Sequence, residues 1–98
     1  MPKGYVYGEV EITDPAQYEK YRELAPASIS MYGGKYLIRR GDPETIEGDH
    51  HPKLVVVLEF ESRERAKEWY NSTRYQHAKS LRQGAAKVNL ILLSGYEP

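Results

Sequence analysis

The sequence predicts an α+β fold of the ferredoxin-like type, β-α-β-β-α-β, in which a four-stranded antiparallel sheet carries its helices on one face. Two observations support this fold: one long apolar strand signal near the middle of the chain, and strand-like and helix-like periods that alternate in this order around it. The central stretch, residues 54–60, contains no turn former and a single charge at Glu59, which is typical of a strand with neither side in bulk water. The strand order 4-1-3-2 would place this strand inside the sheet.

The first part of the chain predicts a strand followed by a helix. Residues 5–12 alternate between apolar and mostly polar side chains, as a strand with one covered face does. Asp14 followed by Pro15 is typical of a helix start, and Gln17 stands where a capping-box partner would reach back. The buried stripe of this helix is expected to consist of Tyr18, Tyr21 and Ala25.

Pro26 interrupts this helix, so we expect either a kink or a second short helical piece over residues 27–32, ended by the two glycines at 33 and 34. Residues 35–40 are predicted to form the second strand. Strict alternation would place two of its residues on one side, Tyr36 and Ile38, and three on the other, Lys35, Leu37 and Arg39.

The second half repeats the pattern. Ser62 and Ser72 are predicted N-caps of two short helical pieces, and residues 88–94 are predicted to form the last strand. Trp69, Tyr70 and Tyr75 have helical core spacing and are read as packing residues. The connection over residues 41–53 is long for a hairpin, which is more typical of a functional loop than of a plain turn.

Composition narrows the function classes. We expect a single domain over residues 1–98. Fourteen basic and fourteen acidic residues cancel, which argues against nucleic acid or a membrane surface as a partner. The absence of cysteine excludes disulfides and thiolate metal sites. With no visible secretory signal and no apolar run of spanning length, we expect a cytoplasmic protein.

The face of the predicted sheet away from the helices would be apolar enough to need a cover. The residues after the last strand, 95–98, are too few to provide it. A second copy of the chain is the simplest cover, so we expect a homodimer. The residues expected on this face are Tyr5, Tyr7, Leu37, Val55, Val57, Ile91 and Leu93.

A series of motifs along nearly the whole chain resembles a known family. The series comprises Tyr5, Thr13-Asp14-Pro15, Tyr21, the run from Gly33 to Arg39, Glu47-Gly48, Glu59-Phe60, Trp69-Tyr70, Ser72, Tyr75 and Leu81-Arg82. It resembles the uncharacterised family called domain of unknown function thirteen-thirty, in the dimeric α+β barrel superfamily. The resemblance implies a homodimer whose two sheets meet as a barrel, and no known substrate. The chain departs from the family pattern at His50 and at Thr73-Arg74.

Glu59 and Arg39 are the predicted catalytic residues, because strict alternation projects both toward the same side of the sheet, together with Glu9. There Glu59 could act as a general base while Arg39 stabilises an enolate or carboxylate. The alternative is an ion pair in which the two charges only satisfy each other. The residues predicted to contact a ligand are Tyr7, Glu9, Glu47, His50, Tyr75 and Arg82.

Two functions remain open from the sequence. One is an enzyme without cofactor that acts on a small organic acid or an aromatic compound in the barrel pocket; the other is a homodimer that binds or senses a metabolite without chemistry. RNA binding is disfavoured because Val55, Val57 and Glu59 stand where stacking aromatics would be needed. Neither a cofactor nor a metal site is predicted, since His50 and His51 lack a third ligand at suitable spacing.

Overall fold

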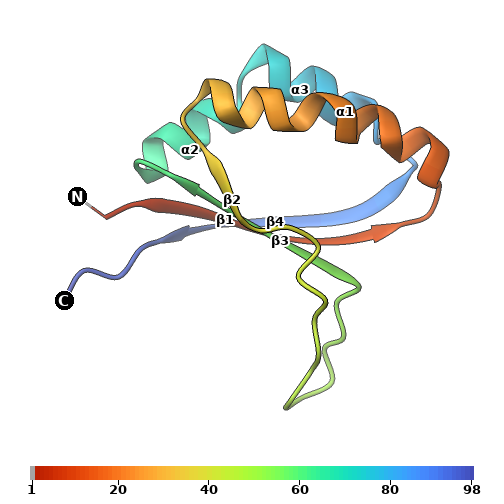
Figure 1. Cartoon of the computed structure of the whole chain (residues 1–98), viewed down its shortest axis with the longest axis horizontal. Helices are drawn as coiled ribbons and strands as arrows, with labels where there is room; N and C mark the ends of the chain where they lie inside the picture. Colours follow the sequence, from red (N-terminus) through yellow and green to blue (C-terminus); the bar gives the residue numbers. More distant parts are fainter. Residues whose placement is uncertain (1) are drawn as a thin grey trace.

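The computed structural model describes residues 2–98, which form a four-stranded antiparallel sheet with a layer of helices on one face (Figure 1). The sheet order β2-β3-β1-β4 confirms the predicted order and puts the apolar central strand inside the sheet. The fold is therefore ferredoxin-like. In chain order the elements are β1 (Gly4–Ile12), α1 (Pro15–Met31), β2 (Lys35–Ile38), β3 (Leu54–Phe60), α2 (Arg63–Tyr70), α3 (Thr73–Ser80) and β4 (Ala86–Ser94).

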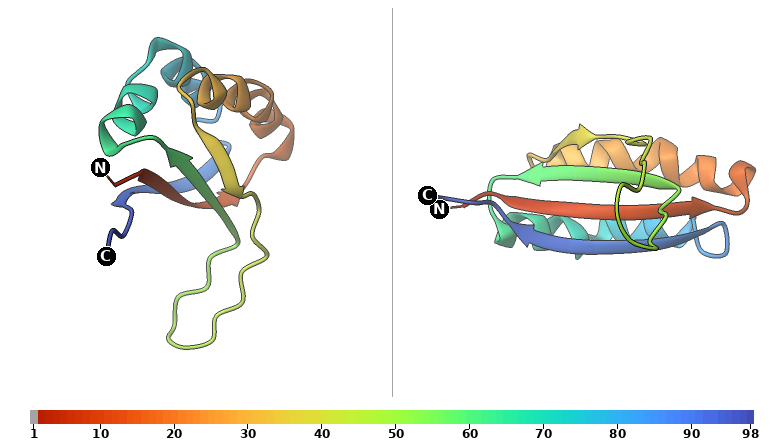
Figure 2. Two further views of the ribbon diagram at one scale, coloured as in Figure 1. Left: turned by 60° about the vertical axis from the view of Figure 1, so that its left-hand side comes forward. Right: turned by 90° about the horizontal axis from the view of Figure 1, so that it is seen from below.

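The two inner strands divide their side chains between the faces as the alternation predicts. Val6 and Val10 of β1 lie under the helices, as do Leu58 and Phe60 of β3, and all four are buried. The register pairs Tyr5 with Glu59 and Tyr7 with Val57, so these four residues share the opposite face. We call this second face the open face, because no helix covers it (Figure 2).

Strand β2 is shorter than predicted and its alternation is broken. Tyr36 pairs with Leu58, but Ile38 pairs with Val57, so one extra residue, Leu37, is accommodated by a bulge. After the bulge, each side chain points to the opposite face from the one that strict alternation predicts. The expectation that Tyr36 and Ile38 share one side is therefore wrong: Ile38 lies on the open face instead.

Helix α1 is continuous across Pro26. Of the two expectations, a kink or a second helical piece, the second is therefore wrong. Asp14 caps the helix as predicted, its side chain accepting a hydrogen bond from the backbone N–H of Gln17 at 3.2 Å. The Gln17 side chain does not complete a capping box. It donates instead to the carbonyl of Leu81 at 2.7 Å, which fastens the start of α1 to the segment after α3.

The helix layer is joined through its aromatic core. Trp69 and Tyr75 are fully buried, which confirms their predicted packing role, and their ring centroids lie 4.2 Å apart. The indole N–H of Trp69 donates to the hydroxyl of Ser28 in α1 at 3.1 Å, and Ser28 is itself fully buried. Gly34 is required after α1, since a Cβ there would lie 2.5 Å from the Phe60 ring.

The connection between β2 and β3, residues 39–53, extends away from the helices on the side of the open face (Figures 1 and 2). We call it the arm. Ile46 in the arm is 93% exposed. No helix within residues 2–98 is long and apolar enough to cross a membrane.

Replacing Ser28 by alanine should destabilise the chain, because the buried indole N–H of Trp69 would lose its acceptor. We expect the free energy of unfolding, measured by urea denaturation, to fall by about 1–3 kcal/mol relative to Ser30→Ala. Ser30 is an exposed serine of the same helix, so its variant controls for helix propensity. Equal stability of the two variants would contradict a structural role for the Ser28 hydroxyl.

Candidate functional site

A cavity of about 300 Å³ lies between the sheet and the helix layer. Its floor consists of residues of β1, β3 and β4, and residues of α1 form much of its roof. We call it the interlayer cavity. Its lining contains aliphatic residues of the sheet and α1, the aromatic residues Tyr18, Tyr21, Tyr36 and Trp69, and four arginines, Arg22, Arg39, Arg40 and Arg82.

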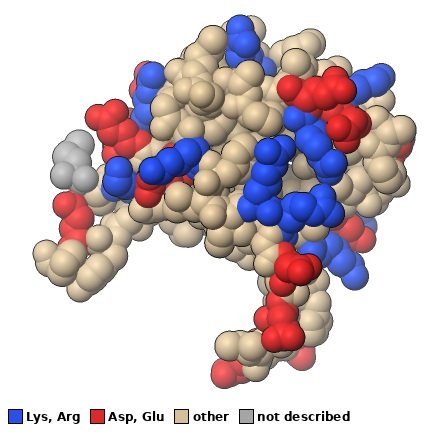
Figure 3. All heavy atoms as spheres, in the orientation of Figure 1, with Lys and Arg blue, Asp and Glu red and all other residues tan. Residues whose placement is uncertain are grey.

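The arginines give the interlayer cavity a positive character. No Asp or Glu of the described chain is among its lining residues. Figure 3 shows Lys and Arg side chains gathered below helix α1 and above the arm. Arg39 and Arg40 line the cavity and are exposed, so we place them at its mouth. The Arg39 guanidinium carbon lies 4.6 Å from the centroid of the Tyr36 ring, close enough for a cation–π contact.

The turn at the start of the arm places the two mouth arginines. Three successive residues, Arg40, Gly41 and Asp42, have φ angles of +80°, +65° and +45°. Left-handed backbone is costly for a side chain as large as that of Arg40. Gly41 is the residue that the turn needs, because a Cβ there would meet the Val55 carbonyl at 3.1 Å.

Arg82 is the inner arginine, and only 8% of it is exposed. Its Nη2 donates to the Tyr75 hydroxyl at 3.3 Å, and that hydroxyl lies 3.0 Å from the hydroxyl of Tyr21. Burial acts to lower the pKa of Arg82, but the Tyr75 and Tyr21 hydroxyls outweigh it, so the pKa lies above its ordinary value. Burial also raises the pKa of Tyr21 far above its usual range, so this phenol stays protonated at neutral pH.

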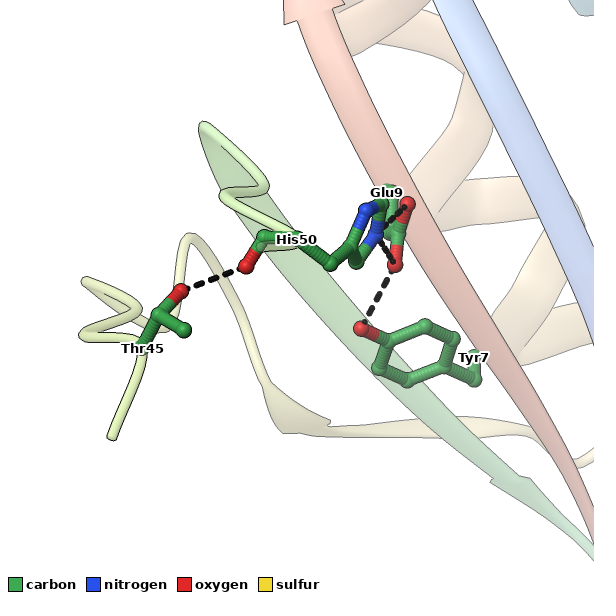
Figure 4. Close-up of polar contacts among 4 residues, drawn as sticks. All are labelled: Tyr7, Glu9, Thr45 and His50. Atoms are coloured by element: carbon green, nitrogen blue, oxygen red, sulfur yellow. Dashed lines mark hydrogen bonds and ion pairs between the residues drawn. The ribbon is translucent and has the colours of Figure 1, made fainter. Parts of the chain in front are cut away.

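A second polar cluster lies on the open face, where the arm begins to leave the sheet. The carboxylate of Glu9 in β1 accepts a hydrogen bond from the Tyr7 hydroxyl at 3.0 Å and contacts His50 Nε2 at 2.8 Å. Thr45 donates to the His50 carbonyl at 2.6 Å. Figure 4 shows the Tyr7 and His50 side chains converging on Glu9 from different segments. Three of the predicted ligand residues therefore lie together.

The contacts of Glu9 act on its proton affinity. The hydrogen bond with His50 is the largest influence and lowers the pKa of Glu9, and the Tyr7 hydroxyl lowers it further. Burial opposes both but is weaker, so the pKa of Glu9 lies below its ordinary value and the carboxylate is ionised at neutral pH. A charged Glu9 of this kind is suited to holding the arm against β1.

The expectation that Glu59 and Arg39 project toward the same side of the sheet is wrong, and with it the alternative of an ion pair between them. Glu59 lies on the open face, accepting a hydrogen bond from the Tyr5 hydroxyl at 2.9 Å and pairing with Lys35 Nζ at 3.3 Å. Arg39 follows the bulge in β2 and stacks over Tyr36 at the interlayer cavity, on the helix side of the sheet. The Tyr5 hydrogen bond, with Lys35, lowers the pKa of Glu59 despite the opposing effect of burial.

The remaining predicted residues fall into separate regions. Tyr75 and Arg82 are joined to each other by a hydrogen bond under the helices. Glu47 and His51 are exposed in the arm, and within residues 2–98 neither side chain hydrogen-bonds to the Glu9 cluster. Within residues 2–98, no group of three or more His, Asp or Glu side chains is placed to hold a metal ion.

The family model described as Domain of unknown function (DUF1330) matches residues 3–96. The chain belongs to this family. Comparison with curated protein sequences gives no match. The family assignment agrees with the motif series along the chain and carries no activity with it.

Solved structures support the fold. A protein of unknown function from Rhodopseudomonas palustris, a structural genomics target, has a TM-score of 0.78 and 22% identity, covering 99% of this chain and 85% of that one. SnoaB, a cofactor-independent oxygenase from Streptomyces nogalater, gives a TM-score of 0.64 at 8% identity, covering 100% and 97%. A dimeric ferredoxin-like protein of unknown function from Thermobifida fusca gives 0.55 at 8%, covering 95% and 91%.

Sequence reasoning missed much of the interlayer cavity in this DUF1330 member. Tyr18 and Tyr21 have core spacing on α1, and nothing local distinguishes a tyrosine that packs from one that lines a cavity. Arg22 and Arg40 belong to no sequence motif that would have singled them out. The one available signal was the lack of any acidic residue among the inward positions of the strands, opposite a helix that carries arginine.

His50→Ala should raise the pKa of the Glu9 carboxyl toward its ordinary value, since His50 is the main cause of its depression. NMR titration of the Glu9 carboxyl carbon measures this change. Tyr7→Phe should raise the same pKa less. A depressed carboxyl pKa adds stability at pH values above about 4.5 that is lost as the pH falls through the folded-state pKa, so His50→Ala should reduce this acid dependence.

His51→Ala is the matched control for this titration, because His51 is the exposed neighbour in the same arm. It should leave the Glu9 titration unchanged. Identical curves for the wild type and His50→Ala would show that the arm does not rest on Glu9 in solution.

Proposed function

We propose that this protein binds a small molecule in the interlayer cavity. The observation that carries the proposal is the cavity itself: about 300 Å³ of space between sheet and helices, with an apolar floor and a few convergent polar groups. Ligand sites in proteins are typically concave, mostly apolar, and oriented by a small number of polar side chains. Arg82, one of the predicted ligand residues, then acts from the helix side rather than from a seam between sheets, and Tyr75 holds Arg82 by a hydrogen bond.

The side chains of the interlayer cavity favour binding over acid–base chemistry. Its lining contains no His, Asp, Glu, Lys or Cys of the described chain. Burial raises the pKa of Tyr18, Tyr21 and Tyr36, so these phenols are poor bases at neutral pH. What the cavity offers a reaction is orientation and stabilisation of negative charge by arginine. A non-catalytic metabolite-binding protein is the function that fits this lining best.

A cofactor-independent enzyme acting on a small organic acid or aromatic compound is the second candidate. It is favoured by the same fold in SnoaB, described as a cofactor-independent oxygenase. Fold likeness at this identity is an argument by analogy. In such an enzyme the substrate would have to supply its own reactivity, with Arg39 and Arg82 stabilising the negative charge that develops. Glu59, on the open face and held ionised by Tyr5 and Lys35, would take no direct part at this cavity.

We also propose that the working form is a homodimer joined through the open face. Apolar side chains on this face remain accessible: Ile38 is 43% exposed, Leu93 46% and Ile91 50%. A cover of the same composition from a second chain would bury them. The description of the Thermobifida fusca protein as dimeric supports this arrangement. The arm extends on the same side and would lie beside the partner (Figure 2).

Filling the interlayer cavity should abolish binding. Leu54 lines the cavity from β3, so Leu54→Trp should displace a bound ligand, whereas Ile46→Trp adds the same side chain to the exposed arm. We would screen small aromatic and aliphatic compounds by thermal shift, measure affinities of the hits, and analyse each mixture for products by mass spectrometry. We expect at least about a tenfold loss of affinity in Leu54→Trp alone, equivalent to about 1.4 kcal/mol.

The products decide between the two candidate functions. Stabilisation by a ligand that is recovered unchanged supports a binding protein, and conversion that is lost in Leu54→Trp supports an enzyme. Hits that bind Leu54→Trp and Ile46→Trp equally well would place the binding site elsewhere.

Leu93→Glu should dissociate the homodimer, because it would bury a carboxylate at the apolar seam. Leu24→Glu is the matched control, since Leu24 is a partly exposed leucine of α1, outside the sheet. Sedimentation velocity should give twice the chain mass of 11.3 kDa for the wild type and the control, and the single mass for Leu93→Glu. A wild type that sediments as a monomer at micromolar concentration would refute the dimer.

A further inference from the structure

We infer that the ligand of the interlayer cavity is an organic anion, a carboxylate or similar oxyanion on an apolar body, whose charged group pairs with Arg82. This inference rests on the proposed function, because it specifies which small molecules the same cavity takes. Three observations support it: the charge of the lining, the unpaired hydrogen-bond donors of one buried guanidinium, and the apolar surface around it.

The charge of the lining is one-sided although the chain is neutral. Four of the fourteen Lys and Arg residues line the interlayer cavity, and none of the fourteen acidic residues does. Arg22 is paired with Glu19 at 3.3 Å. No ion pair joins Arg39, Arg40 or Arg82 to another of the described residues. Three cations at this cavity therefore lack a counterion.

Arg82 needs an anion most. A guanidinium keeps its proton at any physiological pH and carries five N–H donors. Within residues 2–98 its side chain makes one hydrogen bond, to Tyr75, and its Nε is buried without a partner. The Tyr21 ring, 5.1 Å from the guanidinium carbon, adds a cation–π contact, and the Tyr21 hydroxyl lies beside that of Tyr75. A carboxylate would supply both the missing charge and the missing acceptors.

The space on both sides of Arg82 has the same character. A second cavity of about 360 Å³ shares Arg82 and Trp69 with the first and is lined by Lys67 and Lys79, again with no acidic residue of the described chain. Arg82 thus lies between two basic cavities. The exposed Arg39 and Arg40 at the mouth would attract an anion, and the buried Arg82 would hold it.

The rest of the lining selects the body of the ligand. Most of it is aliphatic or aromatic, including Val10, Val56, Leu58 and Leu90. A small inorganic ion would leave this surface uncovered, whereas an anion with a ring or short alkyl body would bury it. The volume lies at the lower end of known ligand sites, which suits a body of one or two rings.

The test compares ligands of one shape and different charge by isothermal titration calorimetry on the wild-type protein. The probes are 2-naphthoate, neutral 2-naphthamide and cationic 2-naphthylmethylammonium, with benzoate and benzamide as a smaller pair and sodium sulfate as the bare anion. We expect an acid to bind at least about tenfold more tightly than its amide, as a charge-assisted hydrogen bond provides. The ammonium compound and sulfate should bind more weakly still.

The Arg82→Met variant tests whether Arg82 causes the preference for an acid over its amide. The variant should bind the acid no better than the amide, while the thermal midpoint of the free protein stays the same or rises, because an unpaired buried charge has been removed. Arg65→Met is the control: Arg65 also stacks on a tyrosine ring, Tyr32, but lies outside both cavities, and its variant should keep the full preference. Arg39→Gln should reduce the preference in part, and replaces Arg82→Met if that variant does not fold.

Each outcome is decisive. Equal affinity for acid and amide, or an unchanged preference in Arg82→Met, overturns the inference and leaves the proposed function standing. Sulfate that binds as tightly as the acids contradicts the apolar body. Failure of every acid and amide to bind the folded wild type counts against the proposed function itself.

Discussion

The hydrogen-bonded chain of Tyr21, Tyr75 and Arg82 is the interaction on which the arrangement depends. Tyr21 belongs to α1, Tyr75 to α3, and Arg82 to the segment that leads into β4, so these hydrogen bonds connect the two halves of the helix layer. Gln17 reinforces the connection by bonding to the carbonyl of Leu81. These polar contacts are directional, and the interlayer cavity lies beside them, with Tyr21 and Arg82 in its lining.

A contact made of buried polar groups costs stability. Aliphatic residues at the same positions would pack without leaving a buried donor unpaired, and replacing buried ionic groups in that way is often neutral or stabilising. The Nε of Arg82 shows that the hydrogen bonding under the helices is incomplete within the described chain. Buried polar groups without partners are rare, and they concentrate at sites where a protein meets something else. In this protein the unpartnered Nε belongs to a residue that lines the interlayer cavity.

The two faces of the sheet carry different groups. The helix side holds the interlayer cavity, whereas the open side carries the ionised Glu9 and Glu59, each held by a tyrosine and a basic group. The same fold occurs in an oxygenase and in proteins of unknown function, so the fold alone does not decide the function. Two of the four arginines at the cavity, Arg39 and Arg40, follow the β2 bulge, and Arg40 begins the left-handed turn after it.

The sequence by itself determined the order of the elements, the strand order and the inward residues of β1 and β3, because alternation and helix caps at Asp14, Ser62 and Ser72 are local signals. It determined the buried aromatics in the same way. The site depended on tertiary structure. The bulge at Leu37 moves Arg39 from the face of Glu59 to the face of Tyr36, and a bulge is fixed by pairing with β3, a strand that begins only at Leu54. A single extra residue reverses every side chain after it, so only the paired sheet decides which charges meet.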